Sequence, residues 1–176
     1  MAKRSGVRPE RFVNRYRGEI TSGANSATAV AATINTGMNV GRADAFKWVL
    51  LGASLMPKHD ELGVVIAASG TTNAFHAQLC IGTQAAFLDG DDMQVICEGH
   101  KSNYWITSGV AAHDWPMVLD VIYPLPVFAQ TLTLLIKTNV DNAQLQNFVW
   151  TFTLWYVMQG IAQGEIVEYL AAFGQV

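Results

Sequence analysis

The stretch that decides the fold is NFVWTFTLWYV, residues 147–157. Its side chains alternate at a period of two, as in a β-strand with one buried face. The face expected to point into a core carries Phe148, Trp150, Phe152, Leu154 and Tyr156. The opposite face, expected to meet solvent or a neighbouring molecule, carries Asn147, Val149, Thr151, Thr153 and Trp155.

The segment TLTLLIKT, residues 131–138, alternates in the same way and is joined to the first strand by a polar loop. The two segments therefore predict a long antiparallel pair. Further apolar and β-branched runs are separated by turns rich in Gly, Pro, Asn and Asp. These runs predict strands over residues 28–35, 46–56, 62–69, 75–81, 92–98 and 118–123.

Eight strands without intervening helices predict an all-β domain of two packed sheets or a closed barrel. We favour an eight-stranded antiparallel jelly-roll sandwich, because the long connection over residues 99–115 suits it better than an up-and-down barrel. Residues 164–174 predict a short C-terminal helix, since apolar side chains recur there at helical spacing before a glycine. The expected organisation is an N-terminal arm, residues 1–17, and a jelly-roll domain, residues 18–176.

The arm, MAKRSGVRPERFVNRYR, concentrates positive charge. It holds six of the eleven basic residues and one acidic residue, a net charge of +5, whereas the other 159 residues hold five basic and thirteen acidic ones, a net charge of −8. The predicted nucleic-acid-binding residues are Lys3, Arg4, Arg8, Arg11, Arg15 and Arg17.

The arm has too little apolar content to fold alone, so we expect it to hold no strand and to contact phosphates without reading sequence. An anionic membrane surface, the acidic face of a neighbouring subunit and a purely solubilising role remain open as alternatives.

The composition favours self-association. Hydrophobic residues make up 51% of the chain and charged residues only 14%, against roughly 25% charged in an ordinary soluble domain. We expect a homo-oligomer whose interfaces each bury on the order of 1,000 Å². No apolar run reaches the roughly 20 residues of a membrane helix, and no signal-peptide pattern is expected.

The sequence gives little support for catalysis or a cofactor. Its histidines lack the close spacing of metal ligands, and no nucleophile motif or phosphate-binding loop is present. Both cysteines lie in strand-like runs and are expected to be small buried hydrophobic residues. We therefore expect no enzyme activity, no metal, no cofactor and no small-molecule substrate. The residues considered are His59, His76, His100, His113, Cys80 and Cys97.

The segment DGDD, residues 89–92, has two interpretations. Clustered carboxylates suit calcium, but the spacing of an EF-hand loop is missing, and Asp-Gly is a common turn signal. A turn is favoured, and calcium bound between subunits stays open.

The layout resembles the single jelly-roll capsid proteins of small icosahedral, tailless viruses. The resemblance rests on the basic arm, the small-residue stretch TSGANSATAVAATINTG over residues 21–37, and the final strand pair. The predicted C-terminal helix is not a general feature of that group. The resemblance implies a capsid protein that self-assembles into an icosahedral shell with its arm facing the genome.

The implied partners are copies of the chain itself, viral nucleic acid and other capsid proteins. The implied location is the virion, after synthesis in the host cytoplasm. A jelly-roll binding module, lectin-like or trimeric ligand-like, is the alternative, for which a carbohydrate groove or a calcium loop would be the expected sign.

Overall fold

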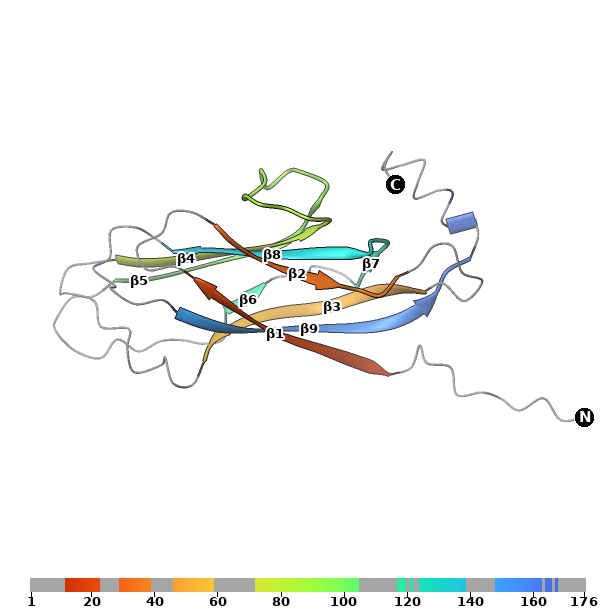
Figure 1. Ribbon diagram of the computed structural model, residues 1–176, viewed down its shortest axis with the longest axis horizontal. Helices are drawn as coiled ribbons and strands as arrows, with labels where there is room; N and C mark the ends of the chain where they lie inside the picture. Colours follow the sequence, from red (N-terminus) through yellow and green to blue (C-terminus); the bar gives the residue numbers. More distant parts are fainter. Residues whose placement is uncertain are drawn as a thin grey trace, which may run out of the picture.

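The computed structural model is an all-β sandwich of two antiparallel sheets (Figure 1). It describes residues 12–22, 29–38, 46–58, 72–104, 117–119, 121, 124–138, 148–162, 164–165 and 167. The strands are β1 (Val13–Ser22), β2 (Val30–Asn35), β3 (Phe46–Pro57), β4 (Thr72–Ile81), β5 (Val95–Tyr104), β6 (Met117–Leu119), β7 (Leu125–Val127), β8 (Thr131–Thr138) and β9 (Phe148–Gly160).

The strand pairs are nested in sequence around the β4–β5 hairpin, so each pair encloses the pairs nearer the hairpin. β3 pairs with β6 and β7, β2 pairs with β8, and β1 pairs with β9, always antiparallel. This ribbon rolls up because β9 also pairs with β3 and β8 also pairs with β4. Sheet A then has the order β1-β9-β3-β6, with β7 also on β3, and sheet B has the order β2-β8-β4-β5. A ribbon of nested pairs rolled into two sheets is a jelly roll, so the expected fold class is confirmed.

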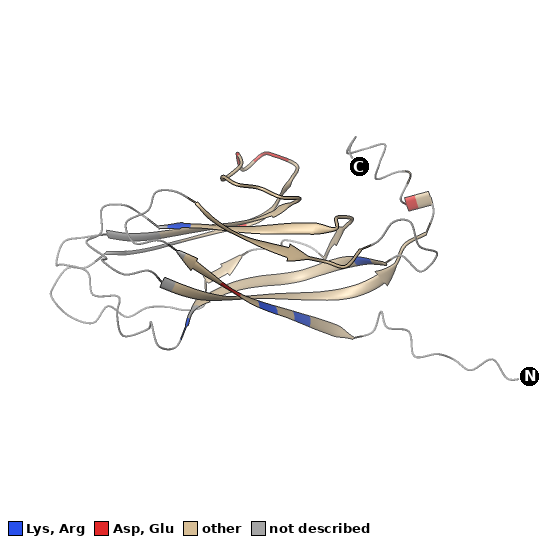
Figure 2. Ribbon diagram, in the orientation of Figure 1, with Lys and Arg blue, Asp and Glu red and all other residues tan. Residues whose placement is uncertain are grey.

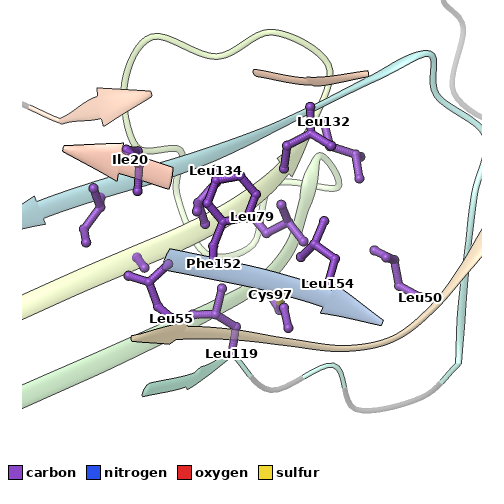
Figure 3. Close-up of a cluster of buried hydrophobic side chains, with 14 of the residues drawn as sticks. Ile20, Leu50, Leu55, Leu79, Cys97, Leu119, Leu132, Leu134, Phe152 and Leu154 are labelled. Atoms are coloured by element: carbon purple, nitrogen blue, oxygen red, sulfur yellow. The ribbon is translucent and has the colours of Figure 1, made fainter. Parts of the chain in front are cut away.

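The core lies between the sheets, where apolar side chains from both inner faces meet (Figure 3). Within the described part of residues 147–157 the predicted alternation is confirmed, since Trp150, Phe152 and Leu154 are buried in the core. Asn147 and the side chain of Phe148 lie outside that part. The indole of Trp150 meets the ring of Phe75 from sheet B edge-on, with 4.9 Å between ring centroids. This contact joins the two sheets near the end of the sandwich where β3 and β8 finish.

Aromatic packing continues along sheet A. Tyr156 stacks on Trp48 with 3.8 Å between ring centroids and an angle of 11°. The ring of Phe152 lies directly against the Cα of Gly18 on β1, in the space that any side chain at that position would occupy. Gly18 thus lets β1 approach β9 closely while Phe152 fills the core.

Several strand predictions need correction. The expectation that residues 1–17 hold no strand is wrong, because Val13–Arg17 form the first half of β1. Cross-strand pairing with β9 outweighs the like charges of the segment. The division into arm and domain after Arg17 stays a prediction. β5 begins at Val95 rather than Asp92 because a turn occupies residues 90–94.

The predicted antiparallel pair of residues 131–138 with 147–157 is wrong, because β8 pairs with β2 and β4 in sheet B, whereas β9 pairs with β1 and β3 in sheet A. Other elements differ in part. β6 spans only Met117–Leu119, and β7 is an additional short strand. The strand predicted over residues 62–69 lies outside the described residues. Of the helix predicted over 164–174, the structure describes Gly164, Glu165 and Val167, which have helical backbone, and no complete helix occurs in the described part.

Candidate interaction surface on the outer face of sheet A

The outer face of sheet B is covered by the chain itself. Residues 82–94, which join β4 to β5, fold over this face (Figure 1). Beneath them, the Gln78 side chain is completely buried although it lies on the outer side of β4. Its amide nitrogen donates to the carbonyl of Leu88 at 3.0 Å, and its amide oxygen accepts from the Leu88 N–H at 2.9 Å. Both polar ends of the buried amide are therefore satisfied by the covering segment.

A second contact that holds residues 82–94 against sheet B involves Thr133 on β8. The Thr133 hydroxyl donates to the carbonyl of Gly82 at 2.6 Å and accepts from the N–H of Gln84 at 3.2 Å. The adjacent outward residue, Leu135, is also completely buried. Sheet B thus needs no further molecule to bury its outward side chains at this end.

The outer face of sheet A is different, because it exposes large apolar side chains to solvent. We call these residues the apolar patch, and they come from β1, β3, β6 and β9. In the described part of the chain they are more than half of the exposed large hydrophobic residues. The patch consists of Val13, Leu51, Met56, Val118 and Trp155, of which Val13 and Val118 are 61% and 58% exposed.

Trp155 lies at the middle of this patch. It pairs with Arg15 of β1 on one side and with Gly52 of β3 on the other. A Cβ at Gly52 would lie 3.7 Å from the indole, so the ring packs over the glycine backbone. Leu51 stands beside it at a shift of register between Leu50 and Gly52, where β3 gains one residue over β9. The bulge leaves Leu51 exposed next to the indole.

Basic side chains border the patch along β1. Arg15 and Arg17 are exposed on the same face as Trp155, and the structure thus places two of the six predicted nucleic-acid-binding residues on a folded strand. Further along β1, Glu19 pairs with Lys58, with 3.4 Å between Oε1 and Nζ. Figure 2 shows the basic positions along β1 on one side of the sandwich and acidic positions in the β4–β5 connection on the other.

The remaining predicted arm residues, Lys3, Arg4, Arg8 and Arg11, lie outside the described residues. Their contact with nucleic acid therefore stays a prediction.

One end of sheet A is covered by the C-terminal segment. Lys47, on the outer side of β3, is buried, and its ammonium lies 2.7 Å from a carboxylate oxygen of Glu165. The ammonium also lies 4.7 Å from the centre of the Phe128 ring. The hydrogen bond from Lys47, with a second from the N–H of Ala162, lowers the pKa of the Glu165 carboxyl. This ion pair holds the chain after β9 against β3.

Two of the four histidines, His76 and His100, lie in the described part as a cross-strand pair on β4 and β5. His76 Nε2 is 3.0 Å from a carboxylate oxygen of Glu98, and its ring packs against Phe87 with 4.5 Å between centroids. Among the described residues, no three His, Cys, Asp or Glu side chains gather as metal ligands. His59 and His113 lie outside those residues.

The cysteines behave as buried hydrophobic residues, as predicted. Cys80 and Cys97 form no disulfide and are buried in the interior. Burial above all, with added repulsion from Asp92 and Glu98, raises the pKa of the Cys80 thiol to about 11. The thiol therefore stays protonated and unreactive near neutral pH.

The DGDD segment forms a turn, as favoured. The N–H of Asp92 donates to the carbonyl of Asp89 at 2.9 Å, and the Asp92 carboxylate accepts from the N–H of Gln94 at 2.8 Å. Calcium bound between subunits stays an untested alternative.

Sequence reasoning identified Trp155 as an outward residue but did not identify the patch. The signal was present in FKWVLLGASLM, residues 46–56, where apolar residues occupy both sides of the strand. A strand that is apolar on both faces indicates cover on both sides. Arg15 and Arg17 alternate with Tyr16 and Gly18, a strand period that the density of charge obscured.

Within the described ranges, no helix is long and apolar enough to cross a membrane. No protein-family model matches the chain, and no curated protein matches it. Among solved structures, it is similar to VP1 of Trichodysplasia spinulosa-associated polyomavirus in complex with GM1 oligosaccharide. The identity is 11%, over 83% of this chain and 94% of that chain, with a TM-score of 0.46. Another structure of this VP1 is 8% identical over 85% and 96% of the two chains, with a TM-score of 0.45. These values describe a likeness in chain path and assign no family.

Proposed function

We propose that this chain is a viral coat protein, a jelly-roll subunit that self-assembles into an icosahedral shell. The observation that carries the proposal is the apolar patch, five large apolar side chains from four strands that are exposed on the outer face of sheet A. Monomeric proteins rarely expose a contiguous apolar surface beyond a few hundred Å², whereas interfaces bury such surfaces. A charged fraction of 14% leaves few residues to keep a lone subunit soluble.

The charge distribution supports a role in enclosing nucleic acid. The first seventeen residues carry a net charge of +5 and the rest of the chain carries −8, so a polyanion is attracted to one segment and repelled by the remainder. The layout shared with single jelly-roll capsid proteins supports a shell as the assembly and the virion as its location, after synthesis in the host cytoplasm. The proposal includes no catalysis, cofactor or small-molecule substrate.

Electron microscopy and sedimentation velocity of the purified full chain test the assembly. We expect closed particles or capsomer rings in equilibrium with subunits. A 19.2 kDa species at every concentration and salt would contradict self-assembly. A trimer that never grows further would instead favour a trimeric ligand-like binding module.

A truncation tests the arm, and β1 decides where it must be cut. Removing residues 1–17 would also remove half of β1, so the variant should begin at Phe12. It loses four basic residues, and nucleic-acid binding should weaken while the melting temperature is retained. If the full arm neutralises about five phosphates, log affinity against log salt should have a slope of about −4. An unchanged affinity and slope in the truncated protein would contradict nucleic-acid binding by the arm.

A further inference from the structure

We infer that the apolar patch of sheet A binds the β4–β5 loop of a second copy of the chain, in a head-to-tail contact that repeats from copy to copy. The inference rests on the proposed self-assembly and names the two surfaces that would carry it. Trp, Arg and Met are enriched at the centres of protein interfaces, and the patch combines Trp155 and Met56 with Arg15 at its border.

Charge argues against packing two sheet A faces on each other. Arg15 and Arg17 are exposed on this face, whereas Glu19, the acidic residue of β1, is engaged by Lys58. Among the described residues of the face, no free carboxylate remains to neutralise the guanidinium groups of a second copy. A symmetric contact would therefore bury like charges, which is costly in a desolvated interface.

The complementary surface lies on the other side of the sandwich. The β4–β5 loop presents Asp89 and Asp91, which are exposed and whose carboxylates have no partner among the described residues. Asp92 is different, because its carboxylate shapes the turn by accepting from Gln94. At the same tip Met93 is 70% exposed, more than any other large hydrophobic side chain in the described part.

The two surfaces are therefore complementary. The β4–β5 loop offers two free carboxylates and one apolar side chain, and the outer face of sheet A offers two guanidinium groups beside the apolar patch. The two surfaces lie on opposite outer faces, so one chain cannot satisfy its own patch with its own loop (Figure 2). A contact between different surfaces of identical subunits is heterologous, and it generates rings or larger closed assemblies when the rotation closes. The six basic residues then divide, with Arg15 and Arg17 serving the subunit contact and the four before Phe12 serving phosphates.

Charge exchange tests this contact in the full chain, after nuclease treatment. One variant carries Arg15→Glu and Arg17→Glu, and the other carries Asp89→Lys and Asp91→Lys. Each alone should raise the concentration needed for assembly at least about tenfold, since like charges then face each other. A variant that combines all four changes should assemble near the parent's concentration, because every altered face then meets a complementary altered loop in a ring of any subunit number. Gln130→Glu, an exposed change outside both surfaces, is the control and should assemble like the parent.

Recovery in the combined variant cannot arise if the changes only prevent folding, so it isolates the contact. Separate variants that assemble like the parent, or a combined variant that melts like the parent but stays dissociated, would overturn the inference while the parent's particles still support the proposed function. Arginine variants that lose only nucleic-acid affinity would assign Arg15 and Arg17 to nucleic acid and would also overturn it. A parent that never assembles would overturn both proposals.

Discussion

The outer faces of the two sheets differ in whether the chain itself covers their outward side chains. On sheet B, the outward side chains of Gln78 and Thr133 are completely buried because residues 82–94 fold over them and satisfy their polar atoms. On sheet A, Trp155 and Val118 stand in solvent, with 36% and 58% of their surface exposed. A sheet that is apolar on both faces must be covered twice. The chain covers one outer face itself, and we propose that a partner covers the other.

The largest expected effect concerns the core that both faces share. Trp150→Ala should lower the free energy of unfolding by roughly 3–5 kcal/mol, because it leaves a large cavity where the indole meets Phe75. Denaturant unfolding followed by circular dichroism measures the loss. Thr151→Ala, one residue along and on the outer side, should change stability little. If the threonine variant unfolds and the tryptophan variant does not, the assignment of inner and outer faces is wrong.

The next prediction concerns residues 82–94, the segment that covers the outer face of sheet B. Gln78→Ala leaves the partly buried N–H and carbonyl of Leu88 without their side-chain partner, at a cost of about 1–3 kcal/mol. Hydrogen exchange at the Leu88 amide should accelerate more than exchange in β8. Gln130→Ala, at an exposed position, serves as the control. Equal protection of Leu88 in the variant and the parent would show that the amide does not hold the loop.

A smaller effect concerns the end of sheet A that the chain covers itself. The pKa of Glu165 is lowered from 4.5 chiefly by its hydrogen bond to Lys47, so the pair stabilises the fold above that value. The stabilisation is lost as pH falls through 4.5 towards the lower pKa of the folded state. Stability measured from pH 7 to pH 3 should therefore fall less in Glu165→Gln than in the parent. Parallel curves would contradict the role of the pair.

The smallest expected effect on folding is at the apolar patch. Val118→Glu changes a side chain that is 58% exposed, so the free energy of unfolding of the monomer should change by about 0.5 kcal/mol or less. Its effect on assembly should nevertheless be large, and sedimentation velocity beside denaturant unfolding separates the two. A variant that loses stability but assembles normally would place Val118 in the fold rather than at an interface.

Local periodicity predicted the parts of this structure that depend on neighbours in sequence. The alternation over residues 147–157 placed Trp150 and Leu154 in the core, because the side chains of any strand alternate between two faces. It could not tell which outer face would be covered. Gln78 is buried only because Leu88, ten residues later, folds back over it, and no period within β4 encodes that.

The strand within the predicted arm is a second feature that local sequence could not predict. Charge suggested an unfolded segment, yet Tyr16 and Ile20 pack against the core and make Val13–Ser22 the edge strand of sheet A. The pairing partner, β9, lies at the far end of the sequence, so the gain from pairing is invisible locally. The candidate surface then follows from topology, which brings Arg15 beside Trp155.

Oxidative footprinting read by mass spectrometry tests most directly whether the outer face of sheet A is the surface left for a partner. The full chain is labelled once as a dilute subunit and once after assembly, and modification of Trp155 and Met56 is compared between the two states. Both are exposed in the single chain, so we predict strong labelling of the subunit and at least about a tenfold reduction after assembly, as in an interface core. Equal labelling of both residues in the two states would show that sheet A stays open in the assembly and would contradict the account.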